Sequence, residues 1–137
     1  MTTTLAALTN HQVRLAARPE GLPKASDWQH SSEPVSEPAD GGVLVKTLMI
    51  SLDPAMRGWM NEGKSYIPPV GIGEVMRAGG VGVVVASKNA AFKAGDFVSV
   101  GTGVQEYALF AADQIKRSGM FKVDTRLGSL SQWMNVL

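Results

Sequence analysis

The amino-acid sequence predicts a mainly β domain, a barrel or a sandwich with short helices. Fifteen glycines and seven prolines divide the 137 residues into short runs rich in Val, Leu, Ile and Met. This pattern is typical of short strands joined by frequent turns. No βαβ pattern occurs, so a doubly wound parallel sheet is not expected. Hydrophobic residues make up 45% of the chain, which is enough for a buried core without disulfides.

The first half of the chain contains three candidate strands. We expect residues 1–9 to be frayed and flexible, a first strand over 12–16 and a second around 28–31. The polar segment 33–42, which is rich in Pro and Gly, predicts an exposed turn. The strand predicted over 42–52 is apolar on both faces, which favours a central position in the sheet.

One helical turn is predicted directly after this strand. Asp is a preferred N-cap residue, and Pro is tolerated at the first helical position because its missing N–H would be unpaired there anyway. We therefore expect a turn of helix over 54–60, capped by Asp53, and then a loop over 61–69.

The second half of the chain continues the sheet. Strands are predicted over 79–87, 97–100, 104–110, 114–116 and 120–123. A turn over 93–96 separates the strands over 79–87 and 97–100. Gly80 and Gly82 have no side chains, so they leave room on one face of the strand over 79–87. Residues 130–137 have helical spacing, and the chain ends inside that helix. We therefore expect a further segment downstream of this chain.

Composition excludes several function classes. Thirteen Lys and Arg residues against twelve Asp and Glu give a net charge of +1, so nucleic acid is not an expected partner. No apolar run approaches the ~20 residues that cross a bilayer, and no secretory signal is present. We expect a cytoplasmic protein without membrane contact. There is no cysteine, and neither His11 nor His30 neighbours an acid, so no metal site is expected.

Phosphate loops and nucleophilic triads are not expected either. Segment 71–76 begins G-x-G, but Met76 occupies the position of a third Gly and the segment precedes a strand. No G-x-S-x-G motif occurs. Acid–base chemistry is left to a few side chains: Tyr66, Tyr107, Asp53 and Glu74. A tyrosine is protonated at neutral pH and can donate to a developing oxyanion. Packing in a loop is the alternative role for either tyrosine.

Five stretches occur together in one order: RLAARPEG (14–21), SLDPAMRG (51–58), SYIPPV (65–70), GEVMRAGGVG (73–82) and KAGDFV (93–98). Their combination resembles the N-terminal domain of the zinc-independent medium-chain dehydrogenases/reductases. The branch it resembles contains prostaglandin and leukotriene reductases, bacterial curcumin reductase and plant alkenal double-bond reductases. Zinc-dependent relatives carry G-H-E where this chain has GIGE at 71–74.

The resemblance implies a GroES-like, partly open β-barrel over 10–125 that forms the substrate side of a cleft. It implies that 126–137 begins a helix leading to a Rossmann domain, absent from this chain, that holds NADP(H). The implied reaction is reduction of the C=C bond of an α,β-unsaturated ketone or aldehyde, without a metal. A homodimer is implied for the intact protein. For this fragment alone, no activity and a tendency to self-associate are expected.

The resemblance also implies roles for individual residues. Tyr66 matches a tyrosine that enters the cleft, so it is the expected catalytic residue and a substrate contact. A segment near the nicotinamide end of the cofactor is matched by Asp53, Pro54, Met56 and Arg57. A structural ion pair is the alternative role for Arg57.

Four further positions are expected to bind substrate. Gly101 and Thr102 match a loop that touches substrate, while Ala55 and Val104 replace the Tyr and Trp that the family usually has. Each replacement removes an aromatic ring, so a roomier pocket is predicted. Two other functions remain open: a freestanding GroES-like binding or assembly module without catalysis, and a fragment of a quinone oxidoreductase.

Overall fold

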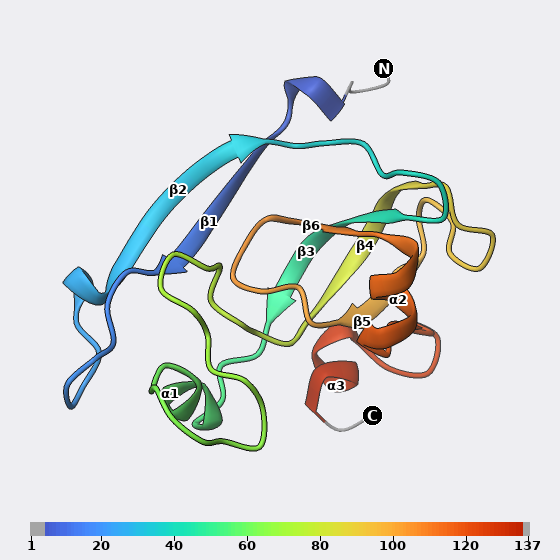
Figure 1. Cartoon of the computed structure of the whole chain (residues 1–137). Helices are drawn as coiled ribbons and strands as arrows, with labels where there is room; N and C mark the ends of the chain where they lie inside the picture. The colour runs from blue at the N-terminus through green and yellow to red at the C-terminus, as the bar shows by residue number, and fades with distance from the viewer. Residues whose placement is uncertain (1–4, 136–137) are drawn as a thin grey trace.

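Two antiparallel sheets carry the fold of the computed structural model, which describes residues 5–135 (Figure 1). Strands β1 (Thr9–Leu15) and β2 (Trp28–Pro34) form the smaller sheet. The larger sheet has the order β6-β3-β4-β5-β7 and comprises β3 (Val43–Ile50), β4 (Gly80–Ser87), β5 (Phe97–Val100), β6 (Tyr107–Phe110) and β7 (Phe121–Lys122). The described helices are short: α1 (Ala55–Trp59), α2 (Ala112–Ser118) and α3 (Leu130–Asn135), with 3₁₀ turns η1 (Leu5–Ala7) and η2 (Ala25–Asp27).

Loops, not a shared ladder, join the two sheets. The inner edge of β1 makes isolated bridges from Gln12 to Gln105 and from Arg14 to Val75. A backbone bond of 3.0 Å from Val13 to Val104 lies between them. The sheets therefore stay open relative to one another, which confirms the predicted mainly β, partly open fold.

The core consists of two separate clusters of buried apolar side chains. One lies on β3, β4 and β5 and is covered by α2: Val43, Val45, Val84, Phe92, Val98, Val100, Ile115 and Met120. The other lies between β1 and the α1 region: Leu15, Met60, Val70 and Met76, with Trp28, Met56, Trp59 and Val104 packed against it. Burying each large aliphatic side chain contributes about 1.5–3 kcal/mol. The second cluster therefore fixes α1 against the smaller sheet.

Strand β3 is central in the sheet, as predicted, between β6 and β4. Only its first half is buried on both faces, however, because Leu48 and Met49 are exposed. Glycines at the β3–β4 contact allow a close approach of the two strands: a Cβ on Gly82 would collide with the Lys46 carbonyl and lie 2.5 Å from Val45 Cγ1. The space that Gly80 and Gly82 were expected to leave beside the strand is thus filled by backbone and neighbouring side chains.

The predicted strand over 114–116 is wrong, because these residues belong to α2. The Gln114 side chain accepts a 2.7 Å bond from the Ala111 N–H at the start of the helix. Arg117 and Asp113 form an i,i+4 pair at 3.0 Å, and Gly119 ends the helix at φ 69°. These local contacts favour helix, and only Ile115 faces the core.

Other boundaries shift in smaller ways. Strand β1 begins at Thr9, earlier than predicted, because all of β1 pairs with β2 up to Pro34. Strand β6 begins at Tyr107, later than predicted. The predicted helix at the C-terminal end is α3 up to Asn135. Of residues 1–9, which were expected to be frayed, the first four lie outside the described residues, whereas Leu5–Ala7 form η1 and Thr9 begins β1. Within 5–135, no helix has the length and apolarity that crossing a membrane requires.

Candidate active site

Two arginines fix helix α1 to the turn after β1. Arg57 on α1 donates from Nε to the Gly21 carbonyl at 3.1 Å and from Nη2 to the Pro19 carbonyl at 2.9 Å. In the opposite direction, Arg18 donates to the carbonyls of Met60 at 2.8 Å and Val70 at 3.1 Å. We call Arg18 and Arg57 the arginine clamp. Each guanidinium reaches across to the other's segment, so the clamp sets the position of α1.

Arg57 makes structural contacts through its whole guanidinium. Its remaining nitrogen, Nη1, donates to Asn61 Oδ1 at 2.6 Å, so all three guanidinium nitrogens hold protein oxygens. The role seen here is structural, through carbonyls and an amide and not through the ion pair considered from the sequence. These bonds use three of the five N–H donors of the guanidinium.

Asp53 does not cap α1 as the sequence suggested. Its Oδ1 accepts a 2.9 Å bond from the Ser51 hydroxyl, and its backbone N–H lies 3.3 Å from the Met56 sulfur. Pro54 occupies the N-cap position with helical backbone angles and makes no side-chain cap bond. Because Asp53 bonds backwards to Ser51, its exposed carboxylate faces away from the helix amides.

Tyr66 is joined to α1 by a hydrogen bond. The indole N–H of Trp59 donates to the Tyr66 hydroxyl oxygen at 2.7 Å. The guanidinium of Arg77 lies 5.4 Å from the centre of the Trp59 ring, and its Nη2 donates to the Pro68 carbonyl at 2.7 Å. The Tyr66 side chain is nevertheless 76% exposed. Tyr66 therefore has a fixed oxygen and a hydroxyl proton directed away from Trp59.

An apolar hollow of about 250 Å³ lies beside α1. It is lined by Val13, Trp28, His30, Ile50, Leu52, Met56, Met76 and Val104. Two residues predicted from the sequence, Met56 and Val104, therefore meet there. Met56 and Trp59 are three positions apart on α1, so they lie on one side of the helix. The same short helix thus borders the hollow and holds Tyr66.

A second hollow, of about 520 Å³, contains two other predicted residues, Asp53 and Gly101. Thr102 next to them is only 2% exposed, and its side chain packs against Gly80. Its side chain has almost no surface to offer a substrate. Ala55 and Pro54 are exposed on α1. Most of the predicted residues thus lie on α1, next to it, or in the lining of one of the two hollows. Thr102 is the exception, because it is buried.

Asp27 supports the same region from beneath the turn. It is 1% exposed, and its carboxylate accepts 2.9 Å and 3.1 Å bonds from the backbone N–H and ammonium of Lys24. The backbone bond, with the ammonium and the charge of Arg57 adding to it, lowers the pKa of Asp27 below its ordinary 3.8 although burial acts to raise it. Its carbonyl accepts from Ala16 and Ala17, so Asp27 ties β2 to the end of β1.

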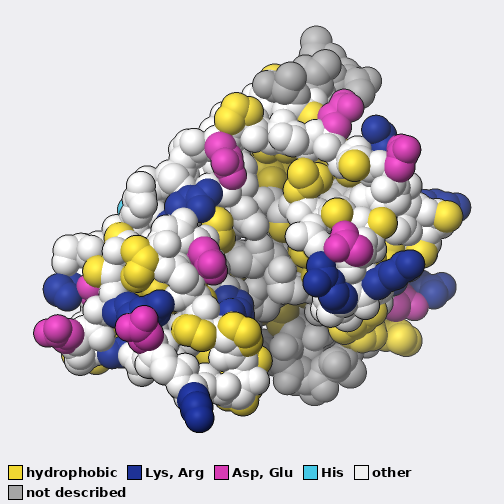
Figure 2. Space-filling model, viewed as in Figure 1, with side chains coloured by type: hydrophobic (Ala, Val, Ile, Leu, Met, Phe, Trp, Pro, Cys, Tyr) yellow, Lys and Arg dark blue, Asp and Glu magenta, His cyan; other side chains and the backbone are white. Residues whose placement is uncertain are grey.

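The sequence analysis did not identify the residues that hold Tyr66 and helix α1 in position. Trp59, Arg77 and Arg18 were not singled out, yet they hold Tyr66 and α1. The only signal was local: a tryptophan seven positions before Tyr66, within the motif region of 51–70. Within the described part of the chain, no group of three His, Asp or Glu side chains could hold a metal ion. Figure 2 shows basic and acidic side chains interspersed over the visible face, without a patch of one sign.

Comparisons with known proteins agree with this architecture. A family profile described as the N-terminal domain of oxidoreductase matches residues 11–118. The chain is 39% identical over 110 residues to the NADPH-dependent curcumin reductase of Escherichia coli strain K12, covering 80% of this chain and 32% of that protein.

Solved structures of CurA from Vibrio vulnificus are also similar. The crystal structure of CurA matches with a TM-score of 0.72 and 46% identity, over 74% of this chain and 30% of that one. The crystal structure of CurA in complex with NADPH matches with a TM-score of 0.70 and 44% identity, over 73% and 30%. The chain spans about a third of the length of these relatives.

The profile covers well over half of the chain, and the motifs that carry the resemblance fall inside its range. This confirms the family expected from those motifs. The chain belongs to the oxidoreductase N-terminal domain family, in the zinc-independent branch of the medium-chain dehydrogenases/reductases.

Proposed function

We propose that this domain is the substrate side of an NADP-dependent oxidoreductase that reduces the C=C bond of α,β-unsaturated ketones or aldehydes. One observation carries the proposal: helix α1 borders an apolar hollow through Met56 and holds the Tyr66 hydroxyl through Trp59. An enone has an apolar body and one carbonyl oxygen, so it needs both features side by side.

Tyr66 stabilises the carbonyl oxygen in this reaction. Reduction at the β-carbon moves negative charge onto that oxygen, and a proton then reaches the α-carbon. A donor fixed before the reaction stabilises this charge without reorganising. Because the Tyr66 oxygen already accepts from Trp59, its own O–H is free to donate to the substrate. The arginine clamp keeps α1, and with it this donor, in position.

NADPH supplies the hydride when it is bound. The residues around α1 suit its nicotinamide end: Met56 and Pro54 offer apolar surface, and the exposed Asp53 carboxylate can accept from an amide N–H. Arg57 already donates three of its five N–H groups to protein oxygens, so the proposal does not rely on it for the phosphates. On this proposal the phosphates are held outside this domain.

A chimera tests the proposal. Residues 10–125 of this chain replace the corresponding part of E. coli curcumin reductase, and NADPH consumption is followed by absorbance. We expect turnover with 4-phenyl-3-buten-2-one and none with the saturated ketone 4-phenyl-2-butanone. Consumption with benzoquinone alone would instead favour a quinone reductase.

Two controls accompany this experiment. The isolated 137-residue chain is expected to oxidise no NADPH with any of these compounds, since on this proposal the cofactor phosphates are held outside this domain. NADPH binding by the chimera, measured by fluorescence, verifies that its cofactor side is intact. A chimera that binds NADPH and reduces no enone would contradict the proposal.

A further inference from the structure

Strand β2 is the outer strand of the smaller sheet (Figure 1). Strand β1 pairs with one of its edges over the whole of Trp28–Pro34. Within residues 5–135, no strand pairs with the other edge, which we call the free edge of β2. An edge of this kind presents unpaired backbone N–H and C=O groups, to which another extended chain can bond.

The bonds of β1 show which backbone groups of β2 point to the free edge. Alternate residues over 11–15 bond to loops on the side of β1 away from β2. One example is the Val13 N–H, which donates to the Val104 carbonyl at 3.0 Å. Successive residues of an antiparallel strand bond to opposite sides. Gln12 and Arg14 therefore bond to β2.

On β2, the residues paired with Gln12 and Arg14 are Ser31 and Gln29. By the same alternation, His30 and Ser32 direct their N–H and C=O groups to the free edge. Both residues are exposed, and within residues 5–135 nothing bonds to these backbone groups. The free edge of β2 therefore offers two donors and two acceptors in alternation.

The edges of the larger sheet are protected, whereas the free edge of β2 is not. Strand β7 is only two residues long, and at β6 the Asn10 side chain accepts the Tyr107 N–H at 3.0 Å. Short edge strands, lysine, proline and bulges are the usual means of preventing edge pairing. Between Trp28 and Glu33, β2 has no lysine or proline, and its register with β1 has no bulge.

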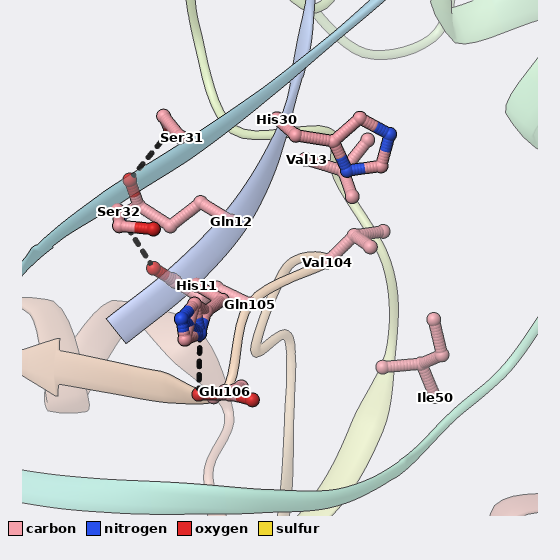
Figure 3. Close-up of a pocket in the computed structure, with 10 residues that line it drawn as sticks. All are labelled: His11, Gln12, Val13, His30, Ser31, Ser32, Ile50, Val104, Gln105 and Glu106. Carbon is pink, nitrogen blue, oxygen red and sulfur yellow. Dashed lines mark hydrogen bonds and ion pairs between the residues drawn. The ribbon is translucent and has the colours of Figure 1, made fainter. Parts of the chain in front are cut away.

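The side chains of β2 leave the free edge open. The Ser31 hydroxyl points back to β1, where it donates to Gln12 Oε1 at 3.1 Å and accepts from Arg14 Nε at 2.9 Å. Figure 3 shows Ser31 beside Gln12, with the His30 side chain pointing away from both. His30 and Ser32 also line a hollow of about 490 Å³ between β1, β2 and the loop before β6. A strand added to the free edge would therefore lie along the rim of this hollow.

We propose that the free edge of β2 pairs antiparallel with β2 of a second copy of this chain, around a two-fold axis at Ser31. A two-fold contact needs a surface that complements itself, and this edge does. His30 of each copy exchanges both N–H and C=O bonds with Ser32 of the other. The smaller sheets of the two copies then form one continuous sheet. This contact is independent of the proposed reaction.

Side chains across the contact favour this register. With the axis at Ser31, the Gln29 amide lies opposite the Glu33 carboxylate of the other copy and can donate to it. An axis at His30 would instead bring Asp27 opposite Glu33, and like charges directly opposite one another are unfavourable. A shift in the other direction loses the contact between amide and carboxylate. The charges of the strand therefore select the axis at Ser31.

Cysteine substitution tests the pairing, because the chain has no cysteine of its own. In Ser31→Cys the two thiols are directly opposite, with Cα atoms about 4.5 Å apart, which a disulfide can bridge. Gln29→Cys, on the same face, is the matched control, since its two copies lie about 14 Å apart. With oxidised glutathione at 0.2 mM chain, we expect at least about 5-fold more linked dimer from Ser31→Cys than from Gln29→Cys on a non-reducing gel.

A second measurement leaves Ser31 in place. Because one pair of strands buries little surface, we expect a weak dimer of the wild-type chain, seen by sedimentation equilibrium up to about 1 mM. Ser32→Pro removes an outward N–H and keeps the ladder to β1, so it should weaken the dimer by about 10-fold or more. Leu127→Ala, at an exposed position away from β2, should not.

Urea midpoints of the variants verify that each is folded. A wild-type chain that stays monomeric up to about 1 mM, or equal cross-linking of the two cysteine variants, would overturn the inference. The free edge of β2 would then be left to a strand from a different protein. No NADPH is used, so this failure is distinguishable from an inactive chimera, which would count against the proposed reaction.

Discussion

Trp59 donates its indole N–H to the hydroxyl oxygen of Tyr66 at 2.7 Å, while the guanidinium of Arg77 lies over the same indole ring. A cation over an aromatic face is attracted to the ring, so Arg77, Trp59 and Tyr66 are linked in that order, by a cation–π contact and a hydrogen bond. The outermost of them, Tyr66, is the exposed one. The relationship gives a surface tyrosine a fixed orientation, which a loop tyrosine ordinarily lacks.

Tyr66→Phe in the chimera is expected to lower kcat/KM for 4-phenyl-3-buten-2-one by about 10- to 100-fold, because the donor to the developing oxyanion is lost. Steady-state NADPH consumption measures the effect. Tyr107→Phe is the matched control, since the chain has only two tyrosines and Tyr107 lies on β6. Wild-type kinetics for Tyr66→Phe would leave Tyr66 with a packing role.

Trp59→Phe keeps an aromatic ring and removes only the donor to Tyr66. We expect kcat to fall by about 3- to 10-fold with little change in KM, because Tyr66 is then less well oriented while the apolar hollow is retained. Combining it with Tyr66→Phe should add no further loss in kcat. Additive losses in the double variant would show that Trp59 acts independently of the Tyr66 hydroxyl.

Arg57→Lys keeps the charge and removes the fork that spans Pro19, Gly21 and Asn61. Because a lysine cannot hold three separated oxygens, we expect a loss of about 1–3 kcal/mol in the free energy of unfolding. Urea denaturation of the 137-residue chain measures it. Arg117→Lys, in the exposed pair with Asp113, is the control and should change stability by less than about 0.5 kcal/mol. Equal effects of the two variants would remove the case for the clamp.

Asp27→Asn is expected to destabilise the chain at neutral pH and to make its stability less sensitive to acid. The pKa of Asp27 is lowered in the folded state by the bonds from Lys24. The unfolded chain therefore binds the proton more readily, so this stabilisation is full well above pH 3.8 and is lost as the pH falls below it. Unfolding midpoints measured from pH 7 to pH 2.5 give the comparison. Parallel curves for the two proteins would refute the assignment.

The sequence analysis predicted the fold correctly where residues close together in the sequence determine the local structure. The Gly and Val run of β4 and the turn over 93–96 needed only strand propensity and turn residues. The segment 114–116 was mispredicted because one apolar residue, Ile115, serves a strand or a helix equally well. The bonds that Gln114 and Asp113 accept from Ala111 and Arg117 favour the helix.

The site was harder to predict because its contacts join distant segments. Arg57 contacts Pro19 and Gly21, which precede it by 38 and 36 positions, and no spacing rule connects them. Val104 and Met56 meet only because the loops that carry Val75 and Gln105 both bond to the same edge of β1. Family motifs indicated which residues gather around α1, whereas the burial of Thr102 and the bond between Trp59 and Tyr66 required the structure.

The position of hydride transfer tests the central claim most directly. The chimera reduces 4-phenyl-3-buten-2-one with NADPH deuterated on the transferred position, and the product is examined by NMR. We predict 4-phenyl-2-butanone carrying deuterium on the β-carbon. Deuterium on the carbinol carbon of an unsaturated alcohol would contradict the account, because the carbonyl and not the C=C bond would then have been reduced.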